Sequence, residues 1–68
     1  MAVVYRKPKD YPDNYMVRVF EGKTGKPTSW IILRDTLEEC REDIRNSGYA
    51  VRFPRAQADD PVIVESWL

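Results

Sequence analysis

The stretch YMVRVFEGKTGKPTSWIIL, residues 15–33, decides how this chain folds. Both of its ends are rich in the β-branched and aromatic residues that favour strands. Residues 21–26 between them contain two glycines, which is typical of a tight turn. The stretch therefore predicts a β-hairpin, with strands over residues 15–20 and 28–33.

The predicted turn fixes the pairing of these two strands. A three-residue loop over residues 23–25, with Gly25 in the left-handed conformation, pairs Gly22 with Lys26. Arg18 then lies opposite Trp30, within reach of a cation–π contact. Because successive side chains of a strand point to opposite faces, both faces of the hairpin are predicted to be apolar.

The best-signalled element is a helix between Thr36 and Gly48. Thr36-Leu37-Glu38-Glu39 matches the capping box that begins many helices. Gly48 suits the left-handed residue that follows a helix. Cys40 and Ile44 share the apolar face of this helix. One short helix covers only one face of a small sheet, so the second face needs another cover.

The remaining segments complete the predicted fold. Residues 49–53 and 62–67 are expected to be strands, joined by a loop over residues 54–61. Residues 1–14 are expected to form an extended N-terminal arm with a possible short edge strand, and residues 15–68 a single α+β domain. The prediction is a small β-β-α-β-β domain, with one helix packed on one face of a mostly antiparallel sheet.

The side of the last strand that faces the helix depends on one carboxylate. Burying Glu65 is costly unless it is paired, so Glu65 is predicted to point away from the helix, and alternation carries Ile63 and Trp67 with it. Tryptophan, phenylalanine and arginine are typical of the centres of interfaces. The face away from the helix is therefore the candidate interaction surface, formed by Met16, Arg18, Phe20, Trp30, Ile32, Arg52, Ile63 and Trp67.

Three covers for this face stay open. A monomer rarely exposes a large apolar face, so the N-terminal arm or the loop over residues 54–61 can close it. A second copy of the chain or another protein can bind it. A single-stranded nucleic acid can stack its bases on Trp30 and Trp67 while Arg18 and Arg52 hold phosphates.

The composition excludes several classes of protein. The 68 residues contain one cysteine and no histidine, so neither an internal disulfide nor a zinc site is expected. Eleven basic residues balance eleven acidic ones, which argues against a dedicated DNA-binding domain. No apolar run is long enough to span a membrane, and the start lacks a signal-peptide pattern. The lone cysteine favours the reducing cytoplasm.

No motif for catalysis is legible. The triplet Gly22-Lys23-Thr24 lacks the strand–loop–helix context of a phosphate-binding loop. Cys40 lies on the inward face of the helix, where a buried apolar role is expected. The pair Asp59-Asp60 is expected to be a solvated turn, since no third ligand for a cation is evident. No enzyme activity, cofactor or metal is therefore predicted.

One local resemblance is present. Tyr15-Met16-Val17, followed by Asp35-Thr36-Leu37-Glu38-Glu39-Cys40, resembles the strand-and-helix pattern of small HicB-like antitoxins. The match is short, and no residue role is carried over from it. The sequence predicts a small non-enzymatic interaction module that forms a homodimer, with weak single-stranded nucleic-acid binding as the alternative.

Overall fold

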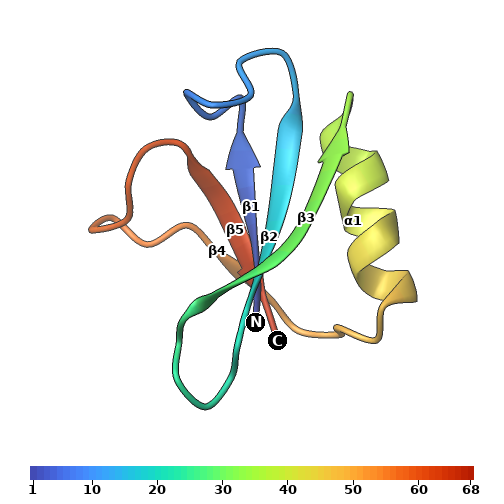
Figure 1. Ribbon diagram of the computed structural model, residues 1–68, viewed down its shortest axis with the longest axis vertical. Coiled ribbons are helices and arrows are strands. Elements are labelled where there is room, and N and C mark those ends of the chain that lie inside the picture. Colours follow the sequence, from blue (N-terminus) through green and yellow to red (C-terminus); the bar gives the residue numbers. More distant parts are fainter.

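The computed structural model describes all 68 residues and contains one five-stranded sheet with one helix on one of its faces (Figure 1). The strands follow the order β3-β2-β1-β5-β4 across the sheet, and every neighbouring pair is antiparallel. The predicted class, a small α+β domain with one helix on a mostly antiparallel sheet, is confirmed. The elements are β1 (Ala2–Arg6), β2 (Tyr15–Phe20), β3 (Pro27–Arg34), α1 (Leu37–Asn46), β4 (Arg52–Pro54) and β5 (Ile63–Trp67).

The first strand, β1, lies at the centre of the sheet, between β2 and β5. The sequence predicted at most a short edge strand here, within an extended arm, and that placement is wrong. Ala2, Val3 and Val4 are all buried, because a continuous apolar run suits a strand that is covered on both faces. Residues 7–14 lie outside the strands, as the connection from β1 to β2.

The predicted hairpin is present as β2 and β3, but its loop is longer by one residue. The N–H of Glu21 donates to the carbonyl of Lys26 at 2.9 Å, so the loop comprises the four residues 22–25. Gly25 has a φ of 69°, the left-handed conformation that the sequence assigned to it.

A break in the pairing of β2 with β3 follows this loop. Phe20 pairs with Pro27, whereas Arg18 pairs with Ile31, so two steps along β2 correspond to four along β3. The hydroxyl of Thr28 fills the break: it donates to the Val19 carbonyl at 2.8 Å and accepts from the Trp30 N–H at 3.2 Å. The predicted pairing of Arg18 with Trp30 is therefore wrong, and the side chains of β3 lie on the opposite faces from those predicted.

The helix α1 begins and ends where the sequence indicated. The hydroxyl of Thr36 accepts from the N–H of Glu39 at 3.2 Å and donates to its carboxylate at 3.0 Å. Gly48 follows the helix with a φ of 96°. These local contacts place α1 directly after β3, and α1 packs over β2 and β3 (Figure 1).

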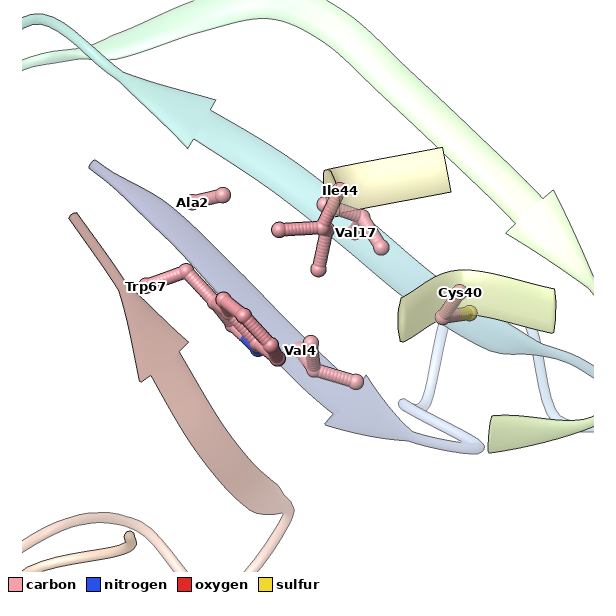
Figure 2. Close-up of a cluster of buried hydrophobic side chains, with 6 residues drawn as sticks. All are labelled: Ala2, Val4, Val17, Cys40, Ile44 and Trp67. Carbon is pink, nitrogen blue, oxygen red and sulfur yellow. The ribbon is translucent and has the colours of Figure 1, made fainter. Parts of the chain in front are cut away.

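The core lies between α1 and the sheet. Figure 2 shows its side chains arriving from β1, β2, α1 and β5. Cys40 and Ile44 are the two buried residues of α1, as the apolar face of the predicted helix required. The core cluster consists of Ala2, Val4, Val17, Cys40, Ile44 and Trp67.

The helix α1 has ten residues and is largely polar. No helix of this structure is long and apolar enough to cross a membrane.

Candidate functional site

The eight residues predicted to form one interaction surface lie on two faces of the sheet. Val17 is in the core beneath α1, and Ile32 pairs with it, so Ile32 and Trp30 face the helix side. Arg52 pairs with the core residue Trp67, so these two also face the helix side. The predicted common face is therefore wrong. The residues that do face away from α1 are Met16, Arg18, Phe20 and Ile63.

The face away from α1 is closed at its centre. Val3 of β1 and Met16 of β2 are each only 5% exposed. Tyr5, on the same face, is partly buried, and this burial raises the pKa of its phenol; nearby Arg18 opposes the shift and Asp60 adds to it. The centre of this face therefore offers no open surface for a partner.

Glu65 explains why β5 presents the face opposite to the one predicted. Its side chain is 1% exposed and lies beneath α1. Arg41 of α1 donates from Nη2 to one carboxylate oxygen at 2.7 Å and from Nε to the other at 3.1 Å. The indole Nε1 of Trp67 donates to the carboxylate at 2.7 Å. The buried carboxylate is thus fully paired, which removes the cost that motivated the outward prediction.

The charge of Glu65 is held in place by these donors. Burial raises the pKa of a carboxyl group, but the hydrogen bonds from Arg41 and Trp67 and the nearby charge of Arg52 outweigh it. The pKa of Glu65 therefore lies below its ordinary value, and the group is ionised at neutral pH.

Arg41 ties α1 to β5 through two carboxylates. It contacts Glu38 at 2.8 Å as well as Glu65, and these hydrogen bonds raise the pKa of the guanidinium. Arg41, Arg45 and Arg52 line a shallow polar hollow of about 220 Å³ above this cluster. Glu38 and Glu65 pair with Arg41, and Glu65 also lies 3.6 Å from Arg52, so the cluster acts as a structural clamp.

A second hollow, of about 240 Å³, opens between α1 and the strands β2 and β3, and it is almost entirely apolar. It exists because a ten-residue helix with two buried side chains covers only part of the sheet. Trp30 contributes to its wall and is 67% exposed, the most exposed of the large apolar side chains. We call this hollow the Trp30 groove; it is lined by Ala2, Val17, Val19, Trp30, Ile32, Ile44, Ser47 and Tyr49.

The Trp30 groove borders a free edge of the sheet. β3 and β4 are the two edge strands. β4 has three residues and ends at Pro54, which cannot donate to another strand. β3 has eight residues, and its only proline is the first residue, Pro27. The edge beside the groove is therefore long enough to accept a further strand.

Sequence reasoning identified only part of this groove. Trp30 and Ile32 were among the predicted site residues, although on the wrong face. Ile44 and Tyr49 were missed, because the groove is made by the packing of α1 against a sheet whose strand order could not be read from the chain. The signal that could have found it was the shortness of the apolar stripe on α1.

The groups that could do chemistry are dispersed or buried. Cys40 is fully buried, and this burial raises the pKa of its thiol to about 11. No cluster of three or more histidine, cysteine, aspartate or glutamate side chains could hold a metal ion. Gly22, Lys23 and Thr24 lie in the exposed hairpin loop.

No protein-family model matches this chain, and the searches of curated proteins and of solved structures found no match either.

Proposed function

We propose that this protein is a small, non-enzymatic, cytoplasmic protein-interaction module that binds its partner through the Trp30 groove and the β3 edge. The observation that carries the proposal is Trp30, two-thirds exposed beside an apolar hollow of about 240 Å³. Tryptophan is enriched among the residues that dominate binding energy, and such residues are buried in well-packed pockets of the complex.

Two features of this surface fit one mode of recognition. An extended segment that adds to a sheet edge gains main-chain hydrogen bonds from that edge and specificity from nearby pockets. β3 supplies the edge, and the groove lies on the same strand through Trp30 and Ile32. The added segment can come from another protein or from a second copy of this chain.

The chemistry of the chain supports a binding role over a catalytic one. The single cysteine is buried with a raised pKa, so little thiolate forms at neutral pH. The most strongly paired charges, Arg41 and Glu65, bind each other and hold α1 to β5. The buried cysteine and this ion pair stabilise the fold, whereas Trp30 is exposed and lies outside the core cluster.

The nucleic-acid alternative loses the surface on which it was based. Arg18 faces away from α1, while Trp30 and Arg52 lie on opposite edge strands of the sheet. Trp67 is buried in the core. These four residues therefore form no common platform for stacked bases. Binding of an oligonucleotide elsewhere on the protein stays a prediction that a low-salt titration tests.

The proposed function is tested by cross-linking in cells. A photoreactive benzophenone amino acid replaces Trp30 in the full chain, and a matched variant carries it at Phe53 on the other edge strand, where the side chain is also exposed. We expect light to produce a discrete protein adduct from position 30 and none from position 53. Absence of an adduct at position 30, or equal labelling from both positions, would contradict the proposal.

A further inference from the structure

We infer that the partner at the β3 edge is a second copy of this chain, with the two β3 strands paired antiparallel about a two-fold axis at Ile31. This inference rests on the proposed function, because it takes the β3 edge as the interaction surface and names what occupies it. Three observations support it: the free backbone groups of β3, its lack of edge protection, and the charges at its two ends.

The hydrogen bonds of Phe20 show which groups of β3 are free. Its N–H donates to the Met1 carbonyl at 2.7 Å, and the Met1 ammonium donates to its carbonyl at 3.0 Å. The backbone N–H and carbonyl of Phe20 therefore point toward β1. Backbone groups of successive residues point to opposite sides of a strand. The backbone N–H and carbonyl of Val17 therefore point toward β3, where Val17 pairs with Ile32.

The same alternation leaves the backbone groups of the two residues that flank Ile32 without a partner in β2. Because Ile32 bonds inward to β2, the N–H and carbonyl groups of Ile31 and Leu33 point to the open edge. These groups form a regular ladder that is ready to pair with another strand.

Pro27 and Arg34 stand at the two ends of β3, but the segment between the break and Arg34 carries none of the devices that keep sheet edges apart. Edges are commonly blunted by charge, proline, a bulge or short length. The segment Trp30-Ile31-Ile32-Leu33 is uncharged and lies beyond the break in the ladder near Thr28. β4, by contrast, is short and contains Arg52 and Pro54. This difference indicates that β4 is a protected edge and that β3 is a paired one.

A two-fold axis at Ile31 places apolar side chains together. Residues opposed across such an axis must lie on the same face of the continuous sheet, so Ile31 faces Ile31 of the other copy. Trp30 of each copy then lies opposite Ile32 of the other, on the face where the Trp30 groove opens. The most exposed apolar side chain of the chain thereby gains a partner.

The same register makes the charges at the two ends of β3 complementary. The hairpin-loop end of β3 in each copy comes beside the α1 end of β3 in the other. The hairpin loop carries Lys23 and is followed directly by Lys26, and the first turn of α1 carries Glu38 and Glu39. Within one chain these groups lie at opposite ends of an eight-residue strand, roughly 26 Å apart at about 3.3 Å per residue. Self-pairing brings the lysines of each copy close to the glutamates of the other, and the two-fold axis repeats this contact.

Disulfide cross-linking tests this register directly. In a hydrogen-bonded antiparallel pair the Cα atoms are about 5.5 Å apart, within the range that a disulfide spans. We expect Ile31→Cys to form a covalent dimer under mild oxidation at least tenfold faster than Phe53→Cys. The native Cys40 can stay in both variants, because it is fully buried.

A mixed experiment checks the result with more exposed positions. Ser29 lies opposite Leu33 of the other copy in this register, and each is offset by four residues, roughly 13 Å, from its own counterpart. We expect Ser29→Cys and Leu33→Cys to cross-link when the two variants are mixed, and much more slowly when each is oxidised alone. Circular dichroism confirms that each variant is folded before oxidation.

The outcomes separate this inference from the proposed function. Cross-linking of Ile31→Cys no faster than Phe53→Cys, together with no mixed product, would overturn self-pairing. If light still yields an adduct with a different protein at position 30, the interaction module stands and only the second copy is wrong. If position 30 yields no adduct at all, both proposals fall.

Discussion

Glu65 shows how one side chain sets the face of a whole strand. The general cost of burying a carboxylate is real, but Arg41, 24 residues away in the chain, cancels it here. The sequence around Glu65 does not indicate this partner, because the packing of α1 against the sheet brings Arg41 to Glu65. The outward prediction for Glu65 therefore failed for a non-local reason, and it carried Trp67 to the wrong face as well.

The clamp between Arg41 and Glu65 predicts a large loss of stability. Arg41→Ala leaves a buried carboxylate without its main partner, which costs about 3–5 kcal/mol. That is enough to unfold a domain of this size. Arg45→Ala is the matched control on the same helix, where the side chain is exposed. Urea unfolding measures both variants, and equal midpoints for the two would contradict the role given to Arg41.

The same carboxylate predicts how stability depends on pH. The pKa of Glu65 in the folded protein lies below its ordinary value of 4.5, so the stabilisation is complete above pH 4.5. It is then lost as the pH falls toward the lowered pKa. We expect the melting temperature to drop in acid more steeply for the native chain than for Glu65→Gln. Identical acid profiles for the two proteins would show that this pairing contributes nothing.

The two tryptophans are predicted to have separate roles. Trp67 is 5% exposed and belongs to the core, so Trp67→Ala should cost about 3–5 kcal/mol of folding stability. Trp30 is 67% exposed, so Trp30→Ala should change folding stability by less than about 0.5 kcal/mol and weaken association. Thermal unfolding and a binding assay on each variant check this division. A Trp30→Ala chain that unfolds as readily as Trp67→Ala would contradict it.

At the scale of elements, what is local was predictable. The helix α1 follows from Thr36, Glu39 and Gly48, whose contacts lie within a few residues of the chain. The existence of the β2–β3 hairpin follows from its apolar strands and its glycines. Its register does not, because the hydroxyl of Thr28 takes the place of a backbone partner in the ladder. The central position of β1 is likewise decided by distant strands.

Thr28 therefore predicts a local change in stability. Thr28→Val keeps the branched shape but removes the hydroxyl that donates to Val19 and accepts from Trp30. We expect a loss of about 1 kcal/mol, and a weakening of the cross-strand contact of Arg18 with Ile31. Ser29→Ala, one residue on and exposed, is the control. NMR contacts and urea unfolding that are unchanged in Thr28→Val would show that this hydroxyl does not set the register.

At the scale of the whole molecule, the protein combines a small core with an unpaired sheet edge at β3. Only 9 of the 68 residues are buried, so the chain has little apolar burial to offset its conformational entropy. Association that covers the Trp30 groove and extends the sheet stabilises the folded state by mass action. The sequence indicated that an apolar surface needs a partner, and it named Trp30 and Ile32. It could not place them on the helix side, because one shift in register exchanges the faces of β3.

The most direct test is sedimentation equilibrium of the native chain over a dilution series, with Trp30→Ala as the comparison. Self-pairing predicts a mass that rises from the 8.0 kDa of one chain toward twice that value as the concentration increases. Trp30→Ala is expected to stay closer to 8.0 kDa at every concentration. A native chain that remains at 8.0 kDa up to about 1 mM, where a dissociation constant corresponds to only about 4 kcal/mol, would contradict the account.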